Sequence, residues 1–148
     1  MGITLNMERL ERFAEIIVRK LRDENYEFYI NQKKHSQSMT LDEYNSKPRN
    51  PNYDQELQKI DDQRFEFLNS LNKNQLNQLD KLILSTLDLT TFNFLREVQE
   101  NLFEDNSIGL TIESQKIEEL TKHLLSGTLF GEYFLWCEQK SKFGKYQF

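Results

Sequence analysis

The chain has 148 residues, with 24 acidic against 19 basic side chains, a net charge of −5 and 37% hydrophobic residues. This length predicts a single helical domain over residues 1–148 with a core of useful size. The acidic balance argues against nucleic acid as a partner, because phosphate binding needs clustered lysine and arginine. Apolar runs are only a few residues long, so neither a membrane-spanning helix nor a signal-peptide core is expected.

One cysteine and two histidines narrow the chemistry further. A lone cysteine cannot form an internal disulfide, which favours a reducing, cytoplasmic setting. The few cysteine and histidine ligands cannot complete a zinc site without carboxylates, so we expect no metal and no cofactor. The sequence also lacks a nucleophile elbow, a glycine-rich phosphate loop, Cys-x-x-Cys and His-Glu-x-x-His. These features favour a protein without catalytic activity.

Apolar residues recur at helical spacing near the N-terminus, at Leu10, Phe13, Ala14, Ile17 and Leu21. They predict an amphipathic helix over residues 6–23, which either ends there or runs on through Tyr29. The periodicity is lost between about residues 31 and 52, where we expect a long loop. Thr40 and Glu43 in this stretch fit a capping box and predict one helical turn.

A second helix is expected to open with Asn52 as its N-cap. One face of this helix is apolar and should be buried, at Tyr53, Leu57, Ile60, Arg64, Phe67, Leu68 and Leu71. A third periodic stretch runs from Leu76 to about Phe103, as one helix or as two that divide near Asp88.

Strict alternation of Ile108, Leu110 and Ile112 predicts a short strand or β-hairpin near residues 108–112. Residues 2–5 are the other β-like segment and the candidate partner. Helices over 114–127 and 128–143 complete a mainly all-α, compact bundle of five or six helices. The last helix is rich in aromatic residues, which we assign to the core, with exposure for a partner as the alternative: Phe130, Tyr133, Phe134 and Trp136.

The negative charge is unevenly distributed. Residues 51–106 hold 11 acidic and 5 basic side chains, whereas the segments before and after carry net charges of +1 and 0. Carboxylates that crowd the C-terminal end of a helix oppose its dipole and destabilise it, which suggests that these acidic residues serve a purpose other than stability. The surface is either solvated or a docking surface for a basic partner. The candidate partner-binding residues are Asp54, Asp61, Asp62, Glu66, Glu97, Glu100, Glu104 and Asp105.

These patterns predict a non-enzymatic acidic binding protein that masks or regulates a basic protein partner. Its biological form would be a bacterial immunity or antitoxin-like protein that occupies the cationic active site of a toxin. One alternative is a small-ligand-binding protein or enzyme with a pocket between helices, using residues such as His123 or Cys137. Another is a homo-oligomeric module whose interface is the aromatic helix around Trp136.

Overall fold

The computed structural model describes residues 2–101 and 108–144. The structure is 77% helical and, within these ranges, contains one two-stranded antiparallel sheet, which confirms the mainly α-helical fold class with a short hairpin. The chain divides into two compact units: unit 1 is Met1–Asn25 with Ile83–Phe148, and unit 2 is Tyr26–Leu82. That the whole chain behaves as one domain stays a prediction. No helix in the described ranges is both long and apolar enough to cross a membrane.

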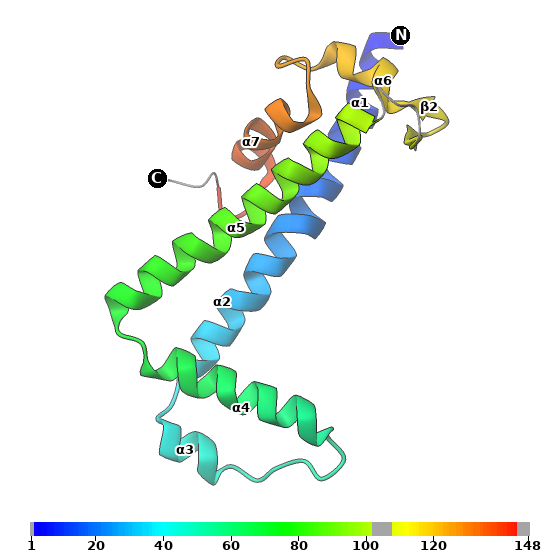
Figure 1. Cartoon of the computed structure of the whole chain (residues 1–148). Helices are drawn as coiled ribbons and strands as arrows, with labels where there is room; N and C mark the ends of the chain where they lie inside the picture. The colour runs from blue at the N-terminus through cyan, green and yellow to red at the C-terminus, as the bar shows by residue number, and fades with distance from the viewer. Residues whose placement is uncertain (1, 102–107, 145–148) are drawn as a thin grey trace. The chain divides into compact units, whose positions relative to one another are not determined.

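The chain begins with a long helical stretch that changes its hydrogen-bonding pattern part of the way along (Figure 1). It comprises α1 (Gly2–Ile16), the π-helix η1 (Ile17–Asp23) and α2 (Glu24–Gln37), and α2 carries the chain into unit 2. The helix predicted over 6–23 is therefore confirmed, in the longer of its two alternatives.

The π-helix changes which side chains of unit 1 reach the core. Its hydrogen bonds close over five residues instead of four, so Arg22 follows Ile17 on the buried side. Arg22 is 0% exposed, whereas Leu21, which the helical spacing assigns to the core, is 37% exposed. The prediction for Leu21 is wrong because it assumed regular α-helical geometry throughout.

The core of unit 1 is built mainly by α7 (Leu129–Lys140) against α1 and η1 (Figure 1). Phe13 packs edge-on to Trp136, with ring centroids 6.1 Å apart. Tyr133 and Trp136 are buried, which confirms their assignment to the core, and Phe130 and Phe134 are partly buried against the same cluster. At 3% exposure, Trp136 offers little surface to a second copy. The buried cluster comprises Ala14, Ile17, Val18, Leu95, Ile117, Leu129, Tyr133, Trp136 and Cys137.

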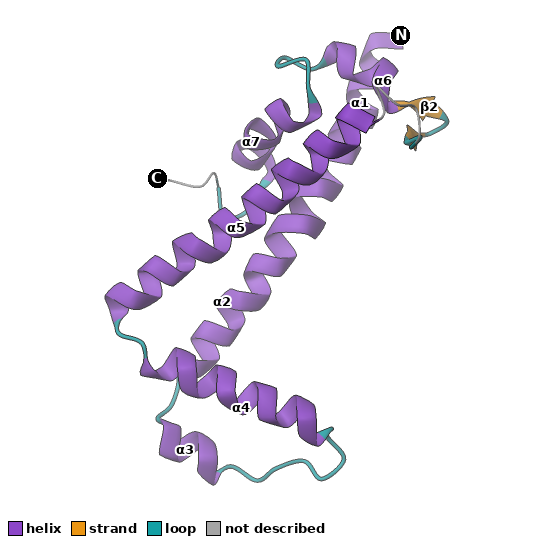
Figure 2. Ribbon diagram, in the orientation of Figure 1, coloured by secondary structure: helices purple, strands orange, loops and turns teal. Residues whose placement is uncertain are grey.

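The predicted hairpin near residues 108–112 is present, drawn in orange in Figure 2. It pairs β1 (Thr111–Ile112) with β2 (Gln115–Lys116) in antiparallel register. Glu113 and Ser114 between the strands have φ values of 50° and 68°, the left-handed pair that a tight two-residue hairpin turn requires. Residues 2–5, the other β-like segment in the sequence, do not pair with the hairpin, since they lie in α1.

Two short helices, α6 (Ile117–Leu120) and the 3₁₀-helix η3 (Thr121–His123), stand where a helix over 114–127 was predicted. That helix is shorter than expected at both ends, because the hairpin takes its first residues and the chain turns at Leu124. Helix α7 then starts at its N-cap Thr128, whose hydroxyl accepts a hydrogen bond from the Gly131 backbone N–H.

Unit 2 contains α2 from Tyr26 onward, α3 (Leu41–Ser46), α4 (Gln55–Ser70) and the first part of α5 (Lys73–Glu100). The loop predicted over 31–52 is wrong in its first part, because α2 continues to Gln37. The predicted turn after Thr40 is confirmed as α3, with the complete capping box between Thr40 and Glu43.

The starts of α4 and α5 are also fixed locally. Asp54, not the predicted Asn52, caps α4 by accepting hydrogen bonds from the backbone N–H groups of residues 56 and 57. Asn72 and Gln75 exchange reciprocal hydrogen bonds at the start of α5. Helix α5 runs without a break through Asp88, which settles the choice between one helix and two.

Candidate functional site on helix α4

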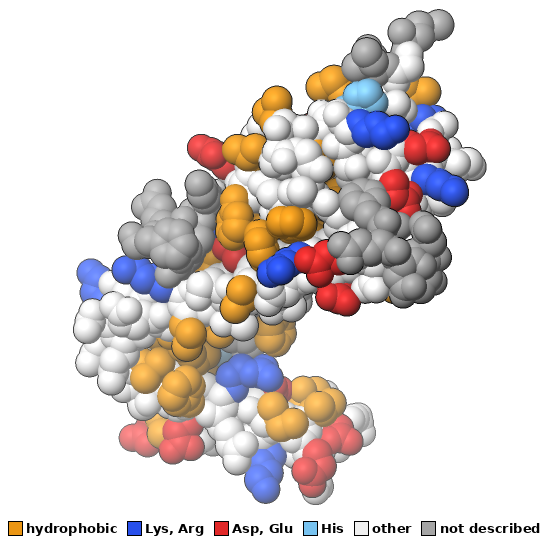
Figure 3. All heavy atoms as spheres, turned by 45° about the horizontal axis from the view of Figure 1, so that its top comes forward, with side chains coloured by type: hydrophobic (Ala, Val, Ile, Leu, Met, Phe, Trp, Pro, Cys, Tyr) orange, Lys and Arg blue, Asp and Glu red, His pale blue; other side chains and the backbone are white. Residues whose placement is uncertain are grey.

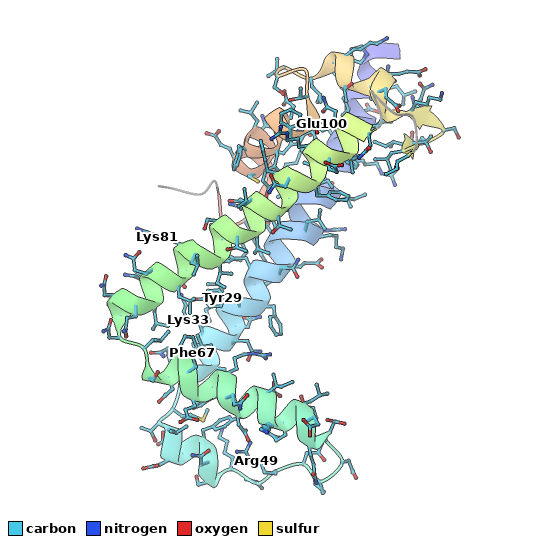
Figure 4. The ribbon with its side chains drawn as sticks, in the orientation of Figure 1. Tyr29, Lys33, Arg49, Phe67, Lys81 and Glu100 are labelled. Carbon is cyan, nitrogen blue, oxygen red and sulfur yellow. The ribbon has the colours of Figure 1, made fainter. Side chains whose placement is uncertain are left out.

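The predicted partner-binding residues fall into separate places in the fold. Asp54, Asp61, Asp62 and Glu66 lie along α4 or at its cap, in unit 2. Glu97 and Glu100 lie at the end of α5, in unit 1 (Glu100 is labelled in Figure 4). Glu104 and Asp105 lie outside the described residues. The structure therefore gathers four of the eight predicted partner-binding residues on one helix, and the candidate site is the surface of this helix.

Helix α4 buries only part of the face that its periodicity predicted: Leu68 is buried as expected, but Leu57, Ile60 and Phe67 are not. Phe65 and Leu68 are buried, at 3% and 4% exposure, and the Phe65 ring stacks on Tyr44 of α3 with centroids 3.8 Å apart and planes 9° apart. Leu57 and Ile60, assigned to the core from the sequence, are 50% and 48% exposed. The stacking on α3 holds α4 in this orientation, and helical spacing alone does not show which neighbour a face will meet.

Three large apolar side chains consequently lie exposed along α4. Leu57, Ile60 and Phe67 share one side of the helix, at spacings of three and seven residues, and Phe67 is 55% exposed (Figure 4). We call these three residues the apolar stripe. Large apolar side chains in a row on a well-formed helix are typical of a protein-binding surface.

The surface extends from α4 onto α2. The Arg64 guanidinium lies 5.4 Å from the centre of the Phe28 ring, and Phe28 is itself 57% exposed. Arg64 stands between Ile60 and Phe67 in sequence and shares their side of α4 by helical spacing, so the cation that contacts Phe28 belongs to the same side as the stripe. Figure 3 shows hydrophobic, acidic and basic side chains intermixed on the visible face of the molecule.

The carboxylates of α4 differ in how strongly they are engaged. Asp62 accepts hydrogen bonds from Tyr44 (2.8 Å), Arg49 (2.6 Å) and Gln58 (2.9 Å). Partial burial by itself raises the pKa of Asp62, but these three donors hold that pKa below its usual value. Asp62 is thus committed to the fold of unit 2.

Asp61 is as exposed as Asp62 but has fewer hydrogen-bond donors around it. Asp61 accepts one hydrogen bond from Tyr53 at 2.8 Å and pairs with Arg64 at 3.4 Å. Glu66 is exposed. Residues 54–70 hold five acidic side chains (54, 56, 61, 62 and 66) against two basic ones (59 and 64), which gives a local charge of −3. The apolar stripe therefore lies on an acidic helix.

The acidic end of α5 is partly neutralised within the chain. Arg96 donates a 3.0 Å hydrogen bond to Glu100, and Asn101 donates one of 2.7 Å to Glu97. Arg96 offsets the charge of Glu100, whereas the neutral Asn101 leaves the charge of Glu97 in place. The helix α4 is the stronger candidate surface because four of the predicted residues lie on it or at its cap.

A small hollow lies beside α4, between it and helices α2 and α3. Its volume is about 200 Å³, and it is lined by Gln32, His35, Tyr44, Asp61, Phe65 and Leu68. The His35 ring meets Phe65 and Tyr44 edge to face, with centroids 5.4 Å and 6.0 Å apart. Sequence reasoning missed this site because residues 31–37 were assigned to a loop, where spacing carries no information.

The residues considered for catalysis lie in unit 1 and offer little reactivity. Cys137 is fully buried, and burial raises the pKa of its thiol to about 11, which leaves it un-ionised at neutral pH. His123 lies 3.4 Å from the Asn6 amide through its Nε2. The described ranges hold no group of three or more His, Cys, Asp or Glu side chains placed to bind a metal ion.

An apolar groove of about 390 Å³ in unit 1 is the natural place for the small-ligand alternative. It is lined by Leu21, Asn25, Leu87, Thr90, Thr91 and Phe94. Its polar side chains bond to helix carbonyls: Asn25 to residues 20 and 21, Thr90 to residue 86, and Thr91 to residue 87. The donors of these side chains are used within their own helices, so the polar groups left for a ligand are the acceptor oxygens of Asn25, Thr90 and Thr91.

No protein-family model matches the chain, and no curated protein or solved structure is significantly similar to it.

Proposed function

We propose that this chain is a binding protein without catalytic activity, which masks or regulates a basic protein partner through the surface of α4. The observation that carries the proposal is the apolar stripe of Leu57, Ile60 and Phe67, exposed on a helix with a local charge of −3. Apolar side chains supply most of the binding energy of an interface, and surrounding charges select and steer the partner.

The construction of α4 favours this role. Its first turn is held by the Asp54 cap, and its far face is held by the stacking of Phe65 on Tyr44. A helix fixed in this way loses little conformational entropy when a partner docks, so more of the contact energy appears as affinity.

An immunity or antitoxin-like role is the biological form that we infer. A cationic catalytic site, such as that of a nuclease toxin, is complementary to an acidic helix, and the chain as a whole carries a charge of −5. Blocking such a site needs a fixed surface and no chemistry from the inhibitor.

The experiment is affinity capture by the immobilised full chain from its native host, followed by calorimetric titration of the purified captured protein at low and raised salt. We expect a basic partner whose affinity falls with ionic strength, since charge steering is screened by salt. The stripe variant I60S/F67S should weaken binding by at least about tenfold, as should the charge reversal D61K/E66K.

The control variant is L125S, which removes an apolar side chain that is 91% exposed but lies in unit 1. It should bind like the wild-type chain. A captured protein that is acidic, or one that binds I60S/F67S and the wild-type chain equally well, would show that α4 is not an acidic docking surface.

Self-association through the same stripe is tested separately by sedimentation velocity over a range of concentrations. A dimer that dissociates in I60S/F67S would replace the proposed partner with a second copy of the chain.

A further inference from the structure

Three cationic side chains of unit 2 are held in the same way, each near both an aromatic ring and a carboxylate. The three sets are Lys33 with Tyr29 and Asp80, Arg49 with Tyr44 and Asp62, and Arg64 with Phe28 and Asp61. Figure 4 labels Tyr29, Lys33 and Arg49. Unit 2 is therefore rich in settings that suit an alkyl chain with a positive end.

The distances in these sets are short enough for direct interaction. The cations lie 5.9, 5.0 and 5.4 Å from the ring centres of Tyr29, Tyr44 and Phe28. The corresponding ion pairs with Asp80, Asp62 and Asp61 measure 2.7, 2.6 and 3.4 Å. A ring and a carboxylate together hold a cation better than either alone, because the ring also packs against its alkyl stem.

The hollow beside α4 has the same two components. Three of the side chains that line it are buried, those of Tyr44, Phe65 and Leu68, and the lining as a whole is more polar than apolar. Its mouth is polar: His35 is exposed, and Gln32 and Asp61 are half-buried. A mainly polar hollow that contains one carboxylate, with buried aromatic and aliphatic side chains beside it, can accept a lysine or arginine side chain.

The polar groups at the mouth keep bonding capacity for a guest. A carboxylate offers about four acceptor positions, and Asp61 uses two, for Tyr53 and Arg64. Neither the Gln32 amide nor the His35 ring nitrogens have a hydrogen-bond partner among the residues that the structure describes. Asp61 follows Leu57 by one helical turn and adjoins Ile60, so the mouth opens next to the apolar stripe.

We propose that this hollow receives the side chain of a lysine or arginine from the basic partner, with its alkyl stem on Phe65 and Leu68 and its charged end at Asp61. The inference rests on the proposed function and names the part of the partner that α4 recognises. Burial of a paired cation at the edge of an apolar contact would make it a central determinant of affinity.

The first test uses small probes with the full chain. N-acetyl-lysine amide and N-acetyl-arginine amide are titrated while the aromatic NMR signals of His35 and Phe65 are followed, with N-acetyl-norleucine amide as the uncharged counterpart of lysine. We expect saturable shifts with both cationic probes and at least about threefold weaker binding of norleucine. Equal binding of all three probes, or shifts that never saturate, would overturn the assignment of a cation site.

The second test compares two variants that each remove one negative charge from unit 2. D61N should weaken the binding of the cationic probes at least about threefold, because the asparagine has no charge and keeps one acceptor oxygen in place of the two that Tyr53 and Arg64 use. The matched control is D42N, which changes an exposed residue in the first turn of α3. It should leave the affinity for the cationic probes unchanged. Identical losses in both variants would mean that net charge, not the hollow, binds the probes.

The captured partner separates this inference from the proposed function. Weaker partner binding by both D61N and H35A supports the hollow as the anchor site. If I60S/F67S weakens the complex but D61N and H35A do not, the hollow is not the anchor and the proposed function stands. If no basic partner binds the wild-type chain, the proposed function fails, and the lysine and arginine titrations alone decide whether the hollow binds cations.

Discussion

Arg22 and Asp88 form a buried ion pair across 66 residues of sequence, with the Arg22 Nε 2.6 Å from the Asp88 Oδ1. Tyr133 donates a second 2.6 Å hydrogen bond to the same carboxylate oxygen, and Arg22 donates another to the Ser141 hydroxyl. Burial by itself lowers the pKa of Arg22, but the hydrogen bond and charge of Asp88 raise it above its usual value. The network joins η1, α5 and α7 within unit 1.

Removing one member of the Arg22–Asp88 pair should strongly lower the stability of the folded chain. We expect Asp88→Ala to lower the free energy of unfolding by about 3–5 kcal/mol, because the buried Arg22 charge would keep only its longer, 3.7 Å ion pair with Asp23. Urea denaturation followed by circular dichroism measures the change. Glu24→Ala, which breaks the exposed pair with Lys20, is the control and should have little effect. A similar loss in both variants would contradict the importance of burial.

Cys137 should be protected from modification in the folded chain. With its pKa raised to about 11 by burial, the thiol should react with Ellman's reagent at pH 8 at least about a hundredfold more slowly in the native state than in urea. Equal rates in the two conditions would show that the thiol is accessible.

The same burial predicts a loss of stability at alkaline pH. The folded state keeps the thiol proton up to a pKa of about 11, whereas the unfolded chain releases it near pH 8.5–9. The Cys137 contribution is therefore fully present below pH 8.5 and falls between about pH 9 and 11, on the order of 2–3 kcal/mol. Burial also raises the pKa of Tyr133, which acts in the same direction. The effect is measured by comparing the free energy of unfolding of the wild-type chain and of Cys137→Ala across this pH range. If the two free energies change with pH in parallel, Cys137 does not contribute to the loss of stability.

Gly131 should not tolerate a side chain, although it lies in a helix. An added Cβ would lie 2.5 Å from the Thr128 hydroxyl and 2.8 Å from that of Ser126, so it would displace the N-cap of α7. Loss of such a cap costs about 1–2 kcal/mol, which exceeds the gain in helix propensity from alanine. Thermal denaturation should show a lower Tm for Gly131→Ala. Gly109→Ala is the control, because no atom lies within 4 Å of its added Cβ.

Two phenylalanines of α4 should differ sharply in their contribution to stability. Phe65→Ala should lower the free energy of unfolding by about 3–4 kcal/mol, since the ring is buried and stacked on Tyr44. Phe67→Ala, two residues along, should change it by about 0.5 kcal/mol or less. Urea denaturation of the two variants makes the comparison, and equal losses would place Phe67 in the core and remove it from the apolar stripe.

The hairpin turn offers a stabilising change. Ser114 has a φ of 68°, a conformation that glycine adopts without steric cost, so Ser114→Gly should raise the free energy of unfolding by about 0.5–1 kcal/mol. Glu113 in the same turn is bonded to Arg9 and Arg12 and should be left in place. A drop in Tm for Ser114→Gly would indicate that its side chain has a role in the turn.

The sequence predicted well those features that depend on neighbouring residues. The capping box of Thr40 and Glu43 and the hairpin near residue 112 involve groups at most a few positions apart, and both are confirmed. The wrong N-cap of α4 is also local: Asn52 and Asp54 are both good caps, and the position where the helix begins decides between them.

Features that depend on distant residues were missed. The exposure of Leu57 and Ile60 follows from the packing of α4 against Tyr44, which no helical period can show. The burial of Arg22 requires both the π-helix and a partner on α5, and the hollow around His35 requires three helices. In the candidate site, Leu57, Ile60 and Phe67 were predicted to share one apolar face of the helix, but their exposure was not predicted. The role of the acidic residues stays a prediction.

The π-helix has a consequence for how this protein can change in evolution. A turn that closes over five residues accommodates one residue more than a regular α-helical turn, so η1 resembles a single-residue insertion retained within a helix. Deleting one residue there would rotate everything after it by about 100° about the helix axis and carry Arg22 away from Asp88. Relatives without the extra residue should therefore have lost both charges together, and any alignment should place its gap within residues 17–23.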